Sequence, residues 1–200
     1  MKLPKLRELA EALRSLFSKA YTSRYPFVKV VPPDGFRGKP EFSEKDCVGC
    51  LACMEVCPGR AIDYIDDKVK KLRTITQHQD NCIFCQQCER ACITEKGIKL
   101  TKEFELSIFD RRQGISESRK ELVICHHCGE IIAPLDHLIF LAKKIGHLQY
   151  TNPTLMLARQ LELKLLSADG LQGNSPHPRA GHLQLICPNC RREMVLKEQW

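Results

Sequence analysis

The feature that most constrains this chain is a pattern of four cysteines that occurs twice with identical spacing. Each run reads C-x2-C-x2-C-x3-C, and every cysteine of the second run lies 35 residues after its counterpart in the first. Zinc knuckles or disulfides are the alternative, but neither explains two identical four-cysteine runs at one period. Because the twelve cysteines fall into tight clusters instead of being spread along the 200 residues, we expect a metalloprotein.

Iron–sulfur clusters account for this spacing. Three thiolates separated by two residues can wrap a single cubane from a tight loop, while the fourth cysteine begins a short helix that points away from it. In the two-cluster ferredoxin pattern, that fourth cysteine ligates the other cluster. We therefore predict two [4Fe–4S] clusters, cluster 1 held by Cys47, Cys50, Cys53 and Cys92, and cluster 2 held by Cys82, Cys85, Cys88 and Cys57.

The segment around the two runs, residues 46–110, is predicted to be a ferredoxin-like two-cluster domain in an α+β chain. We expect short strands near Arg73 to His78 and Ile98 to Thr101, and short helices after Cys57 and Cys92. A domain of about 60 residues is marginally stable by apolar burial alone, so cluster bonds are expected to supply part of its folding free energy.

Residues 1–45 are predicted to form an amphipathic helix followed by an extended arm. Apolar residues recur at spacings of three and four through residues 1–22, Pro4 suits a first helical turn, and lysines and arginines accompany the apolar stripe. The stripe either packs on the core of this protein or lies on an anionic membrane surface or in a partner's apolar groove. Residues 23–45 contain four prolines and two glycines, so we expect no regular element there.

Residues 111–200 are predicted to form a second metal-binding module of zinc-ribbon or rubredoxin type. Two Cys-x-x-Cys pairs, 58 residues apart, suit a tetrahedral metal, and zinc is favoured over a single iron. The gap predicts a helical insertion, with helices from Leu135 to Ile145 and from Pro153 to Leu166, the latter capped by Asn152, and then a loop over residues 167–181. His126 and His127 are expected to be exposed. The four ligands are Cys125, Cys128, Cys187 and Cys190.

Several functional classes are disfavoured. The longest apolar run, Leu138 to Ala142, is far shorter than the roughly 20 residues of a membrane span. Charges interrupt the N-terminal apolar positions, so we expect no signal peptide, and reduced thiolates fit a reducing cytoplasm. The net charge of +7 ignores the thiolates bound to metal, and only three aromatic residues follow residue 111, so a zinc-ribbon nucleic-acid-binding protein is a weak alternative. We find no catalytic constellation.

Beyond the cysteines, the chain resembles a known family. The stretches Tyr21 to Pro26, Phe36 to Glu41, Cys47 to Cys53 and Cys82 to Cys85 resemble the two-cluster subunit shared by respiratory complex I and membrane-bound NiFe hydrogenases. The two additional cysteine pairs are most similar to those of the formate hydrogenlyase ferredoxin subunit. The resemblance covers residues 1 to about 110 well, and rests mainly on the four further cysteines after that.

The resemblance implies an electron-transfer subunit that relays electrons between other iron–sulfur subunits and a NiFe large subunit. It places the N-terminal helix near a membrane arm, on the inner face of the cell membrane. The same motifs also fit the equivalent subunit of a complex I-like NADH/quinone or ferredoxin-dependent oxidoreductase. A free-standing ferredoxin is less favoured, because it gives no role to residues 1–45 or 111–200.

Overall fold

The computed structural model describes residues 5–20, 22, 24–166 and 184–197. The chain divides into two compact units, Met1–Phe36 and Arg37–Trp200. Among the helices described, none has the length and apolar character needed to span a membrane. Pro4 and the predicted loop at residues 167–181 lie outside the described residues.

The first unit contains one helix, α1 (Leu6–Phe17). It begins with a capping box in which the Glu8 carboxylate accepts a hydrogen bond of 3.1 Å from the Lys5 backbone N–H. The predicted amphipathic helix is confirmed, but it ends at Phe17 because Ser18 is extended, at φ −84° and ψ 152°. Within this unit every residue of α1 is exposed, including the apolar stripe that contains Leu6, Leu13 and Phe17.

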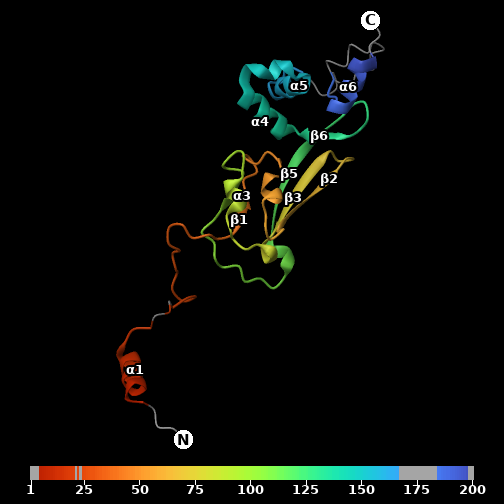
Figure 1. Cartoon of the computed structure of the whole chain (residues 1–200). Helices are drawn as coiled ribbons and strands as arrows, with labels where there is room; N and C mark the ends of the chain where they lie inside the picture. Colours follow the sequence, from red (N-terminus) through yellow and green to blue (C-terminus); the bar gives the residue numbers. More distant parts are fainter. Residues whose placement is uncertain (1–4, 21, 23, 167–183, 198–200) are drawn as a thin grey trace. The chain divides into compact units, whose positions relative to one another are not determined.

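The second unit is built on two antiparallel sheets (Figure 1). The small sheet pairs β1 (Pro40–Phe42) with β4 (Ile98–Leu100), and the larger sheet has the order β2 (Ile62–Asp67), β3 (Leu72–His78), β5 (Ile115–Ile124), β6 (Ile131–Pro134). Both predicted strands, β3 and β4, are present. The expectation of no regular element in residues 23–45 is wrong at β1, because β4 supplies its hydrogen-bonding partner from far along the chain.

The two short helices lie before the fourth cysteine of each run, not after it as predicted. They are α2 (Ala52–Glu55) and α3 (Gln87–Arg90), which carry Cys53 and Cys88. Each helix follows a left-handed residue that reverses the chain, Leu51 at φ 65° and Gln86 at φ 69°. Because the chain reverses there, the helix begins two residues after the second cysteine of the run. The fourth cysteine therefore lies in the turn that follows the helix.

The sequence repeat is also a repeat of backbone conformation. Left-handed residues occur in pairs 35 residues apart, at Gly49 and Phe84, at Leu51 and Gln86, and at Arg60 and Glu95. The helices α2 and α3 are related by the same offset. The two halves are therefore equivalent in three dimensions, including positions where a side chain is strained by a positive φ.

The rest of the second unit is mainly helical. It contains α4 (Leu135–Ile145), α5 (Pro153–Glu162) and α6 (Pro188–Lys197), with short 3₁₀ helices at Gln79–Asn81, Arg111–Gly114 and Gly146–Thr151. The α4 prediction is confirmed at both ends. Asn152 caps α5 as predicted, but α5 ends at Glu162, close to the left-handed Lys164 at φ 56°. Helix α4 packs on β5, and α5 packs on α4, around a core that includes Val123, Leu138 and Leu157.

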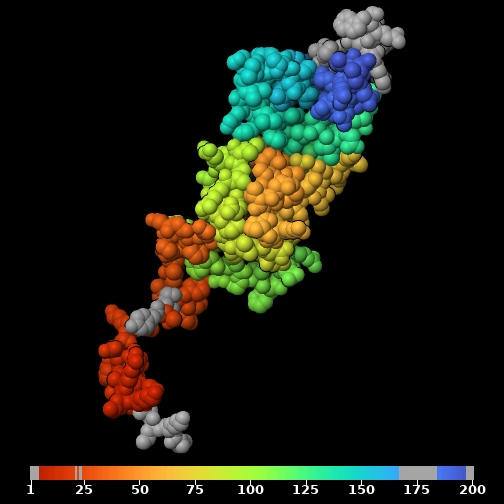
Figure 2. All heavy atoms as spheres, viewed as in Figure 1, coloured from red at the N-terminus to blue at the C-terminus, as the bar shows by residue number. Residues whose placement is uncertain are grey.

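Strand β5 connects the cysteine repeat to these helices. It pairs with β3 over Ile115–Glu121 and with β6 from Leu122 onward, and it runs from one region to the other in Figure 1. In the space-filling view the α4 and α5 region lies directly against the repeat (Figure 2). The contact includes the Cys47 loop, because a Cβ added to Gly49 would lie 3.1 Å from Cγ of Pro134.

Candidate metal centres

The second unit holds two cavities that are lined by the cysteines of the repeat. Cavity 1 is lined by Cys47, Cys50, Cys53 and Cys92, and cavity 2 by Cys57, Cys82, Cys85 and Cys88. Each predicted set of four therefore surrounds one cavity, and the fourth cysteine of each run lies with the first three of the other.

The local fold explains this exchange. In each run the left-handed reversal and the short helix direct the first three cysteines into one cavity. The chain then turns, and β2 or β4 follows the fourth cysteine. Strand β3 crosses behind both sites, since Ile75 lines cavity 1 and Gln77, two residues later on the same face, lines cavity 2.

The thiol groups influence one another mainly within the same groupings. Burial raises the pKa of Cys53 to about 12, with further increases from Cys47 and Cys50 and one from Cys88, which lines the other cavity. Burial likewise raises the pKa of Cys88 to about 11, and the charges of Cys82, Cys85 and Cys57 add to the increase. Four thiolates that share one cavity therefore repel one another, and a cationic iron core would offset that repulsion.

Cys92 differs from these two. Burial raises its pKa, but the Thr94 hydroxyl and the backbone N–H groups of Thr94, Ile98 and Gly97 outweigh burial and lower it overall. The Thr94 hydroxyl lies 3.3 Å from the Cys92 sulfur. The cysteine supplied to cavity 1 by the other run is therefore held in a setting that favours the thiolate, which is the form that binds metal.

Both cavities fit iron–sulfur clusters on further observations. At cavity 1 a side chain is excluded at Gly97, because its Cβ would lie 3.1 Å from the Cys92 sulfur and 3.1 Å from Cα of Cys47. At cavity 2 the amide of Gln77 is buried and, in the part of the chain that is described, neither of its polar atoms has a hydrogen-bond partner. Apart from Thr94 at cavity 1 and Gln86 at cavity 2, the remaining lining residues are apolar, as a site that keeps water from a cluster requires.

Two cations on the sheet, the buried Lys120 and the partly buried Arg73, form hydrogen bonds to the Cys47 loop, and sequence reasoning missed both. Nη1 of Arg73 donates to the Gly49 carbonyl at 2.9 Å, and Nζ of Lys120 donates to the Glu44 carbonyl at 2.5 Å. Arg73 and Lys120 are directly opposite each other on β3 and β5. Like charges in such a pair are destabilising, so each has a carboxylate partner. Asp66 binds Arg73 at 2.7 Å and Asp136 binds Lys120 at 3.1 Å.

The third predicted group also comes together. The sulfur atoms of Cys125, Cys128, Cys187 and Cys190 all lie within 4.8 Å of one another, and those of Cys128 and Cys187 are 3.7 Å apart. Tetrahedral zinc with bonds of about 2.3 Å implies sulfur separations of about 3.8 Å. The four thiols are therefore spaced as a mononuclear metal site requires.

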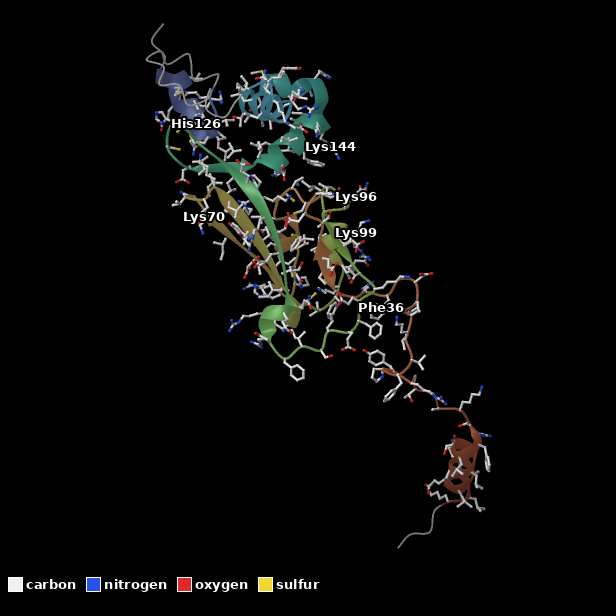
Figure 3. All side chains as sticks on the ribbon, turned by 180° about the vertical axis from the view of Figure 1, so that it is seen from behind. Phe36, Lys70, Lys96, Lys99, His126 and Lys144 are labelled. Atoms are coloured by element: carbon white, nitrogen blue, oxygen red, sulfur yellow. The ribbon has the colours of Figure 1, made fainter. Side chains whose placement is uncertain are left out.

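Backbone donors favour ionised sulfur at Cys125 of this third site, whereas burial and the neighbouring thiols raise the pKa of Cys190. Burial raises the pKa of Cys125, but N–H groups of Cys187, Cys128 and His127 outweigh burial and lower it to about 6. The Cys187 N–H lies 3.2 Å from the Cys125 sulfur. His126 and His127 are exposed, as predicted, and Figure 3 shows His126 beside α6.

Comparison with known proteins agrees with this architecture. Residues 46–96 match the family described as 4Fe-4S dicluster domain. The chain is 34% identical over 128 residues to formate hydrogenlyase subunit 6 of Escherichia coli, covering 62% of this chain and 71% of that protein. It is 27% identical over 176 residues to NAD(P)H-quinone oxidoreductase subunit I of Gloeobacter violaceus, covering 82% of this chain and 83% of that protein.

A solved structure is also similar. It is that of the membrane-bound sulfane sulfur reductase, an archaeal respiratory membrane complex, and one of its chains is 26% identical with a TM-score of 0.42. The match covers 57% of this chain and 61% of that one.

The fold and the two cavities define a dicluster iron–sulfur protein of ferredoxin type. Within that class, the chain belongs to the family of formate hydrogenlyase subunit 6 and NAD(P)H-quinone oxidoreductase subunit I.

Proposed function

We propose that this chain is an electron-transfer subunit of a membrane-associated NiFe hydrogenase complex of the formate hydrogenlyase type. The observation that carries the proposal is the pair of cavities built from exchanged cysteines, since each cavity needs residues of both runs and the two sites are thereby joined in one unit. A [4Fe–4S] cluster supplies one-electron redox chemistry. The chain holds each cluster by four thiolates and shields it with apolar walls.

The ligand assignment follows from the same cavities. Cys47, Cys50, Cys53 and Cys92 hold cluster 1, and Cys57, Cys82, Cys85 and Cys88 hold cluster 2. Anaerobically purified protein should contain about eight irons and eight acid-labile sulfides, because eight cysteines occupy the paired spacing. Its reduced form should give an electron-spin spectrum of two interacting centres. Absence of labile sulfide after anaerobic reconstitution would contradict the proposal.

Partners are proposed from the relatives and from α1. The match to a subunit of formate hydrogenlyase supports a complex of several subunits. Within that complex, other iron–sulfur subunits and a NiFe large subunit are the proposed partners. The exposed stripe of α1 is proposed to attach the chain to the membrane arm, on the cytoplasmic side of the cell membrane. Removal of residues 1–22 should leave the iron and sulfide content unchanged but lower the yield of the complex in copurification. Full yield from the truncated chain would exclude this role of α1.

The equivalent subunit of a complex I-like oxidoreductase is the second candidate. It is favoured by the match to NAD(P)H-quinone oxidoreductase subunit I, which extends over more of the chain. Anaerobic copurification of the tagged chain separates the two, because a nickel-containing large subunit is expected only in the hydrogenase complex.

The C-terminal cysteines are proposed to form a zinc-ribbon-like site with one structural zinc. The sulfur spacing and the backbone N–H groups that face the sulfurs support this assignment. Zinc undergoes no redox change in proteins, so this site would stabilise the helices without carrying electrons. A red, reducible iron centre in natively matured protein would make the site rubredoxin-like instead.

A further inference from the structure

The two cluster cavities are equivalent by the 35-residue repeat, yet cavity 2 has an amide at two positions where cavity 1 has an apolar side chain, Gln86 for Leu51 and Gln77 for Phe42. Nε2 of Gln86 lies 3.4 Å from a carboxylate oxygen of Glu89, so of these two amides the unpaired one is that of Gln77. Phe42 lines cavity 1, and Gln77, which occupies the same position 35 residues later, lines cavity 2. Gln77 lies on β3, between Ile62 of β2 and Ser116 of β5, and is 1% exposed. An amide thus stands at cavity 2 where the related cavity has a benzene ring.

Burying the Gln77 amide destabilises the folded protein unless the amide forms hydrogen bonds. Nε2 and Oε1 of Gln77 both lack a hydrogen-bond partner among the residues that the structure describes. A buried polar group without a hydrogen-bond partner lowers the stability of the fold. The fold accepts an apolar side chain at the equivalent position, as Phe42 demonstrates, so packing alone does not require the amide. Gln77 lines the same cavity as Cys57, Cys82, Cys85 and Cys88, so a cluster held there would bring sulfur acceptors into the cavity that the amide lines.

We propose that the side-chain amide of Gln77 donates an N–H···S hydrogen bond to the cluster in cavity 2 and thereby raises its reduction potential. The proposal rests on the proposed function, because it requires a cluster in that cavity. Hydrogen bonds to cluster sulfurs are one of the terms that set the potential, and they favour the reduced form because it carries more negative charge. Phe42 offers no such donor to cluster 1. Gln77 would therefore contribute to a difference in reduction potential between the two clusters.

The test is a redox titration of the anaerobically purified full chain, followed by electron-spin spectroscopy. Gln77→Met keeps a side chain of similar length and removes the donor. One of the two midpoint potentials should fall by ~59 mV, which corresponds to a tenfold change in the equilibrium constant of a one-electron couple. The other midpoint potential should stay unchanged. Gln77→His restores an N–H donor and should recover part of the shift.

Two control variants separate hydrogen bonding from packing. Phe42→Leu alters the equivalent position of cavity 1 and should leave the Gln77-sensitive midpoint unchanged. Ser118→Ala removes a hydroxyl that is also buried and, among the described residues, also unpaired, but Ser118 lines neither cavity. Both midpoints of Ser118→Ala should match those of the wild type.

The failures of the two proposals are distinguishable. Absence of iron and labile sulfide from the wild type would refute the proposed function, whatever the variants do. Two fully loaded clusters with unchanged midpoints in Gln77→Met would overturn the inference and leave the function standing. If Gln77→Met and Gln77→His both lose one cluster while Ser118→Ala keeps two, Gln77 acts by filling the cavity, and the hydrogen-bond proposal is wrong.

Discussion

Gly49 lies where the cysteine repeat contacts the C-terminal part of the second unit. Its φ of 71° is left-handed, and an added Cβ would lie 3.1 Å from Pro134 Cγ and 3.2 Å from Lys120 Cγ. At the equivalent position of the other run, Phe84 has a φ of 52°. The backbone of the loop thus tolerates a side chain, and contact with β5 and β6 is what selects glycine.

We predict that Gly49→Ala destabilises the protein more than the matched control Gly129→Ala. Gly129 has nearly the same φ, 72°, but a Cβ there would meet nothing within 4 Å. Both variants carry the left-handed penalty of about 1–2 kcal/mol, and only Gly49→Ala adds an overpacking cost of about 1–3 kcal/mol. Thermal unfolding should resolve this, at about 2–4 °C per kcal/mol. Equal midpoints would mean that the loop shifts away from β5 without cost.

The exchanged cysteines give a reciprocal prediction. Cys57→Ser should alter the spectrum of the cluster whose other ligands are Cys82, Cys85 and Cys88, because Cys57 lines that cavity. Cys92→Ser, the equivalent change 35 residues later, should alter the other cluster. Electron-spin spectra of the two reduced variants should therefore be complementary. Damage confined to the cluster of the mutated run would reverse the assignment.

At the scale of single elements, α5 shows how local sequence starts a helix. The Asn152 side chain accepts hydrogen bonds from the backbone N–H groups of Thr154 at 3.0 Å and Leu155 at 3.4 Å, and Pro153 occupies the first helical position. Leu155 and Leu157 then face the core shared with α4. The start of α5 therefore fixes how the α4 and α5 pair packs.

Asn152→Ala should destabilise the protein by about 1 kcal/mol, because two backbone donors lose their acceptor. Asn152→Asp retains the acceptor and should stay near the wild-type stability. The comparison is made by thermal unfolding of the zinc-loaded protein. An alanine variant as stable as the aspartate variant would show that packing against α4 fixes the start of α5 without the cap.

At the scale of the whole second unit, β5 makes the repeat and the C-terminal part interdependent. It pairs with β3 along seven residue pairs, and Lys120 reaches from it to the Cys47 loop. The boundary predicted at residue 110/111 stays a prediction, but excision of residues 111–200 would separate β5 from β3. Experiments on the third metal site therefore require the full chain.

Loss of the third metal should lower stability without removing iron. Cys128→Ser is expected to lose about one zinc per chain and to lower the unfolding midpoint, because the metal links chain segments 58 residues apart. His127→Ala, which changes an exposed neighbour, should keep the zinc and the midpoint. Zinc and iron are measured in both variants by elemental analysis. A drop in iron in Cys128→Ser would instead place this site within the electron-carrying part of the molecule.

Some features of this protein could be predicted from sequence signals that span only a few residues. The cysteine spacing identified the dicluster domain, which the family match supports, and Asn152, Pro153 and Gly146 marked helix ends that the structure contains. These signals are local because a metal loop and a helix cap each involve groups only a few residues apart. The four cysteines that line each cavity were also predicted from sequence, from the known geometry of the paired motif.

Other features depended on which strands pair, and no local signal carries that information. The β1–β4 pairing, the position of α2 before Cys57, and the contacts of Arg73 and Lys120 with loop carbonyls 24 and 76 residues away came only from the tertiary structure. Gln77 lies in a strand that was predicted, yet its role depends on a cavity that β3 shares with residues of both runs. The sequence specifies the chemistry of each side chain. The partners of that side chain depend on packing between segments that are far apart along the chain.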